Sequence, residues 1–223
     1  MNRRSLVLSA SALGVAAFAG GSWLVRDRQA REAAAEAEAR AAAIPDLNAL
    51  LVRPTAPILG PEDAPVTLVE FFDPSCEACR AFHPVLKQLR AEFPDSLRIV
   101  MRYAAFHQGS DEAVAILEAA RRQGLFEPVL NALLENQPAW ARHDRPNLEI
   151  AWDAAEAAGL NVSTRDIETR YPATVAILTQ DRADIEALGV RATPTFYLDS
   201  RQLTDVSFQS LTERVRQAVT ESS

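Results

Sequence analysis

The only two cysteines in this chain of 223 residues are Cys76 and Cys79, and two residues separate them. Two thiols at this spacing can form and break a disulfide with each other and with a second molecule. A structural bridge fits the pattern less well, because a disulfide that closes so short a loop adds little stability. A structural zinc site takes about four ligands, and the cysteines supply half of them. The spacing therefore favours redox chemistry.

His83 leaves a metal-binding alternative open. It lies four residues beyond Cys79 and seven beyond Cys76, so a helix would place the three side chains on one face. Thiolate and imidazole groups are ligands for copper and zinc, which makes a copper- or zinc-handling protein one alternative. The simpler interpretation of His83 is a surface histidine packed beside the cysteines. The other alternative is a non-enzymatic interaction module.

The cysteine pair follows a predicted strand and opens a predicted helix. Residues 66–72 are mostly β-branched, aromatic or aliphatic, as in a buried strand. Pro74 ends this strand, and Ser75 is suited to cap the following helix. Apolar residues then recur at the spacing of a helix face, at Phe82, Val85, Leu86 and Leu89. Unpaired amides and the helix dipole favour a thiolate at this turn, so we expect Cys76, the more exposed cysteine, to be the nucleophile and Cys79 to resolve the mixed disulfide.

Two segments carry a resemblance to a known family. The run from Glu70 to Cys79, Glu-Phe-Phe-Asp-Pro-Ser-Cys-Glu-Ala-Cys, resembles the active-site segment of DsbA-type thiol:disulfide oxidoreductases, members of the thioredoxin-like superfamily. Residues 189–196, Gly-Val-Arg-Ala-Thr-Pro-Thr-Phe, are similar to the cis-proline loop of that family. The resemblance extends over residues 54–220. It implies an α/β, thioredoxin-like fold with an inserted helical subdomain, and disulfide exchange with protein substrates.

The resemblance also implies roles for individual residues. Cys76 and Cys79 would form a redox-active disulfide, and no other cofactor is expected. Pro194 is expected in cis beside Cys76, with neighbouring backbone groups free to bind an extended substrate peptide. Thr193 would face the cysteines and adjust their reactivity. The expected partners are cysteine-containing exported proteins and a membrane redox partner that recycles the pair.

Glu77 and Ala78 separate the cysteines, at the place where strong oxidants of the family carry a histidine. An acidic neighbour disfavours the thiolate of Cys76 and raises its pKa. We therefore expect a reduction potential between those of the strongest oxidants and of thioredoxin. The direction of exchange, disulfide oxidation against reduction or isomerisation, stays open.

Two charged residues fall in predicted strands. Glu70 shares a strand face with Leu68, and the resemblance places it beneath the cysteine pair as a buried acid that exchanges protons with Cys79. The alternative is an acid at an exposed strand end. Arg102 lies in the next predicted strand, residues 97–106, and by resemblance it is expected to be the counterion that keeps Glu70 charged.

Helices are predicted between that strand and the distal Thr-Pro-Thr run. Apolar spacing and glycine stops predict helices over residues 111–123, 126–136, 147–158, 163–170 and 172–188. Short strands at residues 196–198 and 202–204 and a final helix over residues 207–220 follow. The earlier helices would form an insertion over about residues 107–188 in a domain of residues 54–223.

The first 25 residues are predicted to lie outside this domain. Arg3 and Arg4 precede an uncharged stretch, and Ala17-Phe18-Ala19 matches the small-x-small pattern of a signal-peptidase site. Uncleaved, the stretch is just long enough to span a bilayer. The paired arginines loosely resemble a twin-arginine export signal, so the export route stays open. Residues 1–25 are thus predicted to be a signal peptide or membrane anchor, with the domain in the periplasm, either free or tethered to the inner membrane.

A helical spacer is predicted for residues 26–53. Residues 27–43 are rich in helix-forming Ala, Glu and Arg, and Pro45 interrupts them. A solvated spacer is the simpler interpretation. Oligomerisation through residues 27–44 is the alternative, because small apolar residues approximate a heptad seam at Ala30, Ala34, Ala37, Ala41 and Ile44, although alanine buries little area. The formal net charge of −7 argues against nucleic acid as a partner.

Overall fold

The computed structural model describes the backbone of residues 3–222 and the side chains of residues 22–222. The chain forms two compact units, residues 1–43 and residues 44–223. The first contains a long helix, α1 (Arg3–Ala42), which ends before Pro45, the predicted helix breaker. Among the described residues, no helix combines the length and the hydropathy that crossing a membrane requires. The signal peptide or anchor predicted for residues 1–25 lies largely outside the described side chains.

The second unit begins inside the predicted spacer. After Ile44 the chain forms a short helix, α2 (Leu47–Leu51), and Leu51 is fully buried in the core. Arg53 pairs with Asp184 at 2.6 Å. The compact unit thus includes residues 44–53, which the sequence assigns to the spacer.

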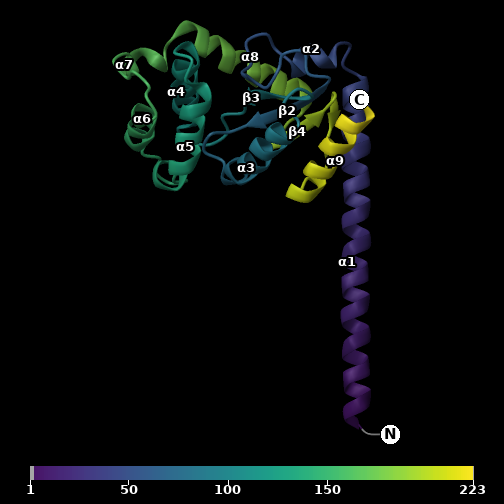
Figure 1. The fold of residues 1–223 in the computed structure, drawn as a ribbon. Helices are drawn as coiled ribbons and strands as arrows, with labels where there is room; N and C mark the ends of the chain where they lie inside the picture. The colour runs from purple at the N-terminus through teal and green to yellow at the C-terminus, as the bar shows by residue number, and fades with distance from the viewer. Residues whose placement is uncertain (1–2, 223) are drawn as a thin grey trace. The chain divides into compact units, whose positions relative to one another are not determined.

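A sheet forms the centre of the second unit (Figure 1). In the described chain its strands are β1 (Ile58–Leu59), β2 (Val66–Phe72), β3 (Leu97–Tyr103), β4 (Thr195–Leu198) and β5 (Arg201–Gln202), in the spatial order β1-β3-β2-β4-β5. β2 and β3 are parallel and joined by the crossover helix α3 (Glu77–Glu92), and β4 runs antiparallel to β2. The apolar strand β2 is thus central. β1 has only two residues, which are too few for a strand period to show in the sequence.

A helical insertion separates β3 from β4, as the sequence predicts. Its helices are α4 (Ser110–Arg122), α5 (Phe126–Trp140), α6 (Leu148–Ala157), α7 (Arg165–Glu168) and α8 (Pro172–Leu188). Figure 1 shows α4 to α7, coloured teal to green, gathered beside the sheet. The predicted ends agree within two residues, except that α5 continues past residue 136. The last helix, α9 (Phe208–Glu221), is capped by the Ser207 side chain.

The sheet is covered on both faces, and the side chains of β2 alternate between them. Leu68 and Phe72 pack into the core formed with α3 and the insertion, whereas Val69 and Phe71 pack into a second core with α2 and α8. Glu70 lies between Leu68 and Phe72 at two-residue spacing, so it points to the same face as they do. Its side chain therefore lies on the face covered by α3, where the cysteines are.

Candidate active site

Cys76 lies at the N-cap of α3, and Cys79 lies in the first turn of that helix. The Cys76 amide donates to the Asp73 carbonyl at 3.0 Å, which closes the turn after β2. The sequence predicts Ser75 at the cap, but the cap is one residue later, and the Ser75 hydroxyl accepts a hydrogen bond from Ser110 at 2.7 Å. Cys76 is 6% exposed and Cys79 is 1% exposed, so Cys76 is the cysteine that a substrate can reach.

The surroundings of Cys76 stabilise its thiolate. Both cysteines are free thiols, and the pKa of Cys76 is lowered to about 5. The largest cause is a hydrogen bond with the Cys79 side chain, and hydrogen bonds from Thr193 and from the amides of Cys79 and Ala78 add to it. Partial burial of Cys76 acts in the opposite direction, but the hydrogen bonds outweigh it. Cys76 is therefore ionised at neutral pH.

Cys79 has the opposite electrostatics. Burial raises its pKa far above the ordinary value, and the hydrogen bond with Cys76 and the charges that Glu70 and Cys76 carry when ionised raise it further. Cys79 therefore remains a thiol while Cys76 is a thiolate. The two cysteines, one helical turn apart, thus differ in ionisation, so that Cys76 can act as the nucleophile or leaving group while Cys79 keeps its proton.

Glu70 is a buried acid rather than an acid at an exposed strand end. Its side chain is 1% exposed, and Oε1 has no hydrogen-bond partner among the described residues. Burial, and then the negative charge of Cys76, raises its pKa to about 8. Glu70 therefore holds a proton at neutral pH, on the same side of the sheet as Cys79.

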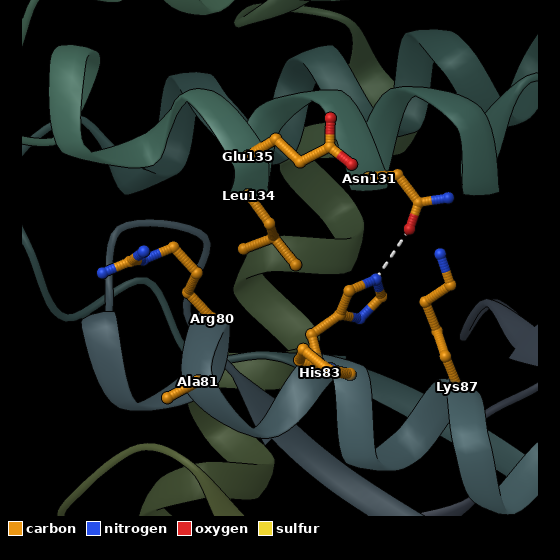
Figure 2. A pocket seen from close by; sticks show the side chains of 8 residues that line it. Arg80, Ala81, His83, Lys87, Asn131, Leu134 and Glu135 are labelled. Carbon is orange, nitrogen blue, oxygen red and sulfur yellow. Dashed lines mark hydrogen bonds between the residues drawn. The ribbon is translucent and has the colours of Figure 1, made fainter.

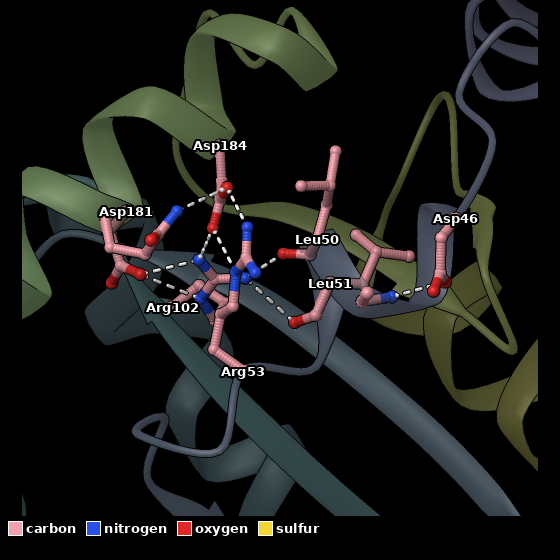
Figure 3. Close-up of polar contacts among 9 residues, drawn as sticks. Asp46, Leu50, Leu51, Arg53, Arg102, Asp181 and Asp184 are labelled. Carbon is pink, nitrogen blue, oxygen red and sulfur yellow. Dashed lines mark hydrogen bonds and ion pairs between the residues drawn. The ribbon is translucent and has the colours of Figure 1, made fainter.

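Arg102 pairs with two aspartates rather than with Glu70, so the predicted counterion pair is wrong. Figure 3 shows its guanidinium beside Asp181 and Asp184 of α8, each at 2.6 Å. It also donates to backbone carbonyls at the end of α2. In the parallel register Arg102 lies opposite Phe71, and both side chains point to the face away from Glu70. The sheet itself separates the side chains of Arg102 and Glu70.

The loop that contains Thr193 and Pro194 lies against the cysteines. The peptide bond between the two residues is cis. The Cys76 sulfur lies 3.2 Å from the Thr193 carbonyl oxygen. The loop leads directly into β4, in which Thr195 is registered opposite Phe71 of β2, so the sheet holds the loop beside the cysteine turn.

Gln137 of α5 connects the insertion to the cysteine turn, and sequence reasoning missed it. Its Nε2 donates to the carbonyls of Pro74 and Cys76 at 2.8 and 3.0 Å. Its Oε1 accepts a hydrogen bond from Arg80 at 2.9 Å. Gln137 is buried, and the signal in the sequence is a polar residue on the apolar face of a helix.

Asp73 is the second residue that sequence reasoning missed. Its fully buried carboxylate accepts hydrogen bonds from the amides of Ser75, Phe106 and His107. The side chains of His107 and Ser110 also contact it. Asp73 thereby joins the cysteine turn to the loop after β3, which is 34 residues away in the sequence.

Glu77 and Ala78, between the cysteines, are exposed. Glu77 pairs with His143 at 2.8 Å. A hydrogen bond with its own amide, and then His143, lowers the pKa of Glu77. The pKa of Cys76 is low with this acid in place, so the hydrogen bonds at the helix start outweigh the acidic neighbour. The intermediate reduction potential remains a prediction.

His83 lies in a pocket of about 490 Å³ between α3 and α5. Figure 2 shows its ring pointing toward Asn131, whose Oδ1 lies 2.7 Å from Nε2. Burial lowers the pKa of His83, which keeps the ring neutral at pH 7. Within the described part of the chain, no three His, Cys, Asp or Glu side chains are arranged to hold a metal ion. The described contact of the His83 ring is with Asn131, and it does not favour the copper or zinc alternative.

Comparison with known proteins places this geometry in a family. Residues 53–217 match the family model described as thioredoxin. The chain belongs to the thioredoxin family. A thioredoxin-like oxidoreductase from Silicibacter pomeroyi is 28% identical, with a TM-score of 0.66 over 79% of this chain and 98% of that one. The alpha-DsbA1 protein of Wolbachia pipientis has a TM-score of 0.70 at 16% identity, over 79% of this chain and 97% of that one, so the fold is of the DsbA type.

Curated relatives of similar sequence are named as ion antiporters rather than as oxidoreductases. The Na(+)/H(+) antiporter NhaA of Herminiimonas arsenicoxydans is 36% identical over 162 residues, which are 71% of this chain and 25% of that protein. This chain thus spans about a quarter of the length of the curated relatives it matches. The similarity does not carry ion exchange over to this chain.

Proposed function

We propose that this protein is an extracytoplasmic thiol–disulfide oxidoreductase that acts on cysteine-containing proteins through Cys76 and Cys79. The observation that carries the proposal is the placement of the pair, with Cys76 at the N-cap of α3 and Cys79 buried in its first turn, which lowers the pKa of Cys76 and raises that of Cys79. A thiolate is the attacking and the leaving species in disulfide exchange. Membership of the thioredoxin family supports the same chemistry.

In the oxidising direction, a substrate thiolate attacks the sulfur of Cys76 in the Cys76–Cys79 disulfide. The bond between the two cysteines breaks, and Cys79 leaves. A second substrate thiolate then attacks the substrate sulfur of the mixed disulfide and releases Cys76 as a thiolate. The low pKa of Cys76 makes it a good leaving group in this step. The reducing direction runs the same steps in reverse, with Cys79 attacking the mixed disulfide.

Glu70 supplies the proton that Cys79 needs in the first of these steps. Cys79 leaves as a thiolate in a buried site, where a negative charge is unfavourable. Glu70 lies on the same side of the sheet and is protonated at neutral pH, because its pKa is about 8. In the reducing direction Glu70 takes the proton from Cys79 and so activates it.

The loop at Thr193 and Pro194 is the proposed substrate-binding edge. It lies next to Cys76, and β4 continues from it into the sheet. An extended peptide that pairs with backbone groups of this loop, ahead of the paired strand β4, would bring its own sulfur to Cys76.

The proposed compartment is the periplasm, with a membrane redox partner that recycles the pair. Its supports are the leader pattern of the first 25 residues and the need for an oxidising environment to keep a cysteine pair oxidised. The helical spacer is the proposed connection to the membrane. Oligomerisation through residues 27–44 is a further proposal.

One assay tests the proposed activity. Wild type is compared with Cys76→Ser and Cys79→Ser in reduction of insulin and in oxidation of a reduced, unfolded protein substrate. We expect Cys76→Ser to lose both activities, and Cys79→Ser to trap a mixed disulfide with the substrate without turnover. Turnover that survives in Cys76→Ser would overturn the proposal. Absence of turnover in wild type would favour an interaction module, and stoichiometric copper or zinc binding lost on His83→Ala would favour a metal-handling protein.

The direction of exchange follows from the reduction potential. We expect a value between about −120 mV, as for DsbA, and about −270 mV, as for thioredoxin. Equilibration of the pair with glutathione buffers measures it. A potential at least as oxidising as the DsbA value would contradict the expected influence of Glu77.

A further inference from the structure

Lys87 is the only lysine in the chain, and it lines the pocket between α3 and α5. It is exposed, and its side chain makes no ion pair or hydrogen bond within residues 22–222. Arg90, one helical turn further along α3, pairs with Glu127 of α5 at 2.7 Å. Beside this ion pair, the pocket leaves the Lys87 ammonium group available to a ligand.

Arg80 is the second cation of the pocket, two helical turns before Lys87 and so about 10 Å from it along α3. Its Nε donates to Oε1 of Gln137 at 2.9 Å. Its two terminal nitrogens have no hydrogen-bond or ion-pair partner in the described part of the chain. Arg80 can therefore keep its bond to Gln137 and still bind a carboxylate through its other nitrogens.

The rest of the lining limits the kind of ligand. It consists of Ala81, His83, Pro84, Asn131, Leu134 and Glu135. Leu134 supplies buried apolar surface, and His83 and Asn131 pair with each other. Glu135 of α5 is the one carboxylate among the described lining residues, so the pocket has two positive charges and one negative charge (Figure 2). This excess of positive charge, in a chain of net charge −7, favours an anionic ligand over a metal cation.

Gln137 connects this pocket to the cysteine turn. The side chain that accepts a hydrogen bond from Arg80 also donates one to the Cys76 carbonyl at 3.0 Å. One buried side chain thus separates Arg80 from the backbone of the reactive cysteine. An extended polypeptide advances roughly 3.3–3.6 Å per residue. A substrate whose cysteine lies at Cys76 would therefore reach the stretch from Arg80 to Lys87 with residues about three to six positions away.

We propose that this pocket binds acidic side chains of the polypeptide substrate, with Arg80 and Lys87 pairing with carboxylates that lie about three to six residues from the reacting cysteine. The inference rests on the proposed function and names a substrate class for it, polypeptides with acidic residues near a cysteine. The binding is non-covalent, so it changes the affinity for the substrate and leaves the exchange steps at Cys76 as they are. Glu135 opposes such a ligand, and its removal should strengthen binding.

Synthetic peptides test the preference. Each carries two reduced cysteines, and one peptide of a pair has glutamates three and six positions before the first cysteine where the other has glutamines; a second pair places them after the last cysteine. The rate at which oxidised full-length protein converts each peptide to its disulfide is measured against peptide concentration. In at least one pair we expect the glutamate peptide to half-saturate at a concentration at least about threefold lower, with the same maximal rate, as for exposed ion pairs.

The sign of the difference separates the pocket from the field of the whole protein. A net charge of −7 by itself repels an acidic peptide and would make the glutamine peptides bind more tightly. Either that result or equal half-saturation in both pairs would overturn the proposal.

Variants assign the preference to the pocket. Lys87→Gln should remove most of it, Lys87→Arg should keep it, and Glu135→Gln should increase it, because the opposing carboxylate is gone. Lys87 and Glu135 are exposed, so these variants should fold. Arg182→Gln is the matched control, since it removes an exposed cation on α8 and changes the net charge equally. The same loss of preference in Arg182→Gln would assign the effect to net charge and overturn the role of the pocket.

Acylation of Lys87 gives a readout that does not depend on disulfide exchange. Because Lys87 is the only lysine, amine acylation mapped by mass spectrometry reports on the pocket. The probe is the preferred glutamate peptide, acetylated at its N-terminus and with serine in place of both cysteines. We expect it to slow acylation at Lys87 by at least about threefold, and its glutamine version to leave the rate unchanged. Absence of protection, or equal protection by inorganic phosphate at the same concentration, would overturn the assignment to an acidic polypeptide.

The outcomes also separate this inference from the proposed function. A wild-type protein that oxidises all the peptides equally keeps the proposed function and overturns only the role of the pocket. A wild-type protein that oxidises none of them overturns the proposed function.

Discussion

At the scale of residues, Cys76 and Cys79 show how far surroundings decide the chemistry of a side chain. One thiol lies at a helix start with hydrogen-bond donors around it, and the other is buried. The spacing of the pair and its position after a strand could be predicted, because both are local in the sequence. The contact of His107 with Asp73 and that of Gln137 with the cysteine turn could not, since His107 and Gln137 come from segments that only the tertiary fold brings to the site.

Glu70 gives a prediction at this scale. Its pKa is about 8 in the folded protein and near 4.5 in the unfolded chain, so the folded state keeps a proton that the unfolded chain releases in this window. Stability is therefore lost as the pH rises from about 4.5 to 8. Glu70→Gln cannot ionise, and we expect it to exceed wild type by a few kcal/mol at pH 8, on the order of 1.4 kcal/mol per pKa unit at most, and to match it near pH 4.

Urea unfolding of the reduced protein at pH 4 and pH 8 measures this difference. Glu156→Gln is the control, since Glu156 is an exposed glutamate in α6. A stability difference that is the same at both pH values would contradict the raised pKa. The same variant should slow the exchange reaction, because Cys79 loses its proton donor.

At the scale of elements, the sequence predicted the helices well and the strand faces less well. Helical spacing repeats over several turns, and glycines mark the ends, so the insertion could be placed within a few residues. The partner of Arg102 depends instead on the register of β3 against β2, which places Arg102 opposite Phe71 rather than beside Glu70. A strand alternates its faces at each residue, and its sequence alone does not say which face meets which neighbour.

Arg102 yields the prediction at this scale. Its guanidinium is fully buried between Asp181 and Asp184, so Arg102→Met leaves the buried carboxylate of Asp181 without its cation, while Asp184 keeps Arg53. We expect a loss of about 3–5 kcal/mol in the free energy of unfolding. The pKa of Cys76 should not change, because the sheet lies between this ion cluster and the cysteines.

Denaturant unfolding measures the loss of stability, and alkylation of Cys76 as a function of pH measures its pKa. Arg182→Met is the matched control, because Arg182 is an exposed arginine on the same helix. A variant that folds with wild-type stability but has lost exchange activity would show that Arg102 serves the site after all.

At the scale of the whole molecule, the two compact units divide the chain at residue 43. The cores on both faces of the sheet lie in the second unit. Composition and Pro45 indicated where the first helix ends, but the buried position of Leu51 did not follow from a short apolar run. Packing against distant helices, which the sequence does not display, decided the boundary.

This division predicts that a chain starting at Ile44 keeps the fold. We expect its melting temperature and its rate of insulin reduction to match those of the full chain, because it retains both cores and the site. A chain starting at Pro54 should be less stable, since it lacks Leu51 and the Arg53–Asp184 pair. Equal stability of the two shortened chains would contradict the boundary at residue 43.

The hydrogen bonds of Gln137 give the insertion a mechanical connection to the chemistry. Its side-chain amide donates hydrogen bonds to two carbonyls of the cysteine turn, those of Pro74 and Cys76. A displacement of α5 must either pull this turn along or break both bonds. A partner that docks on the helical insertion and displaces α5 would thus change the position of the Cys76 backbone without contacting the sulfur.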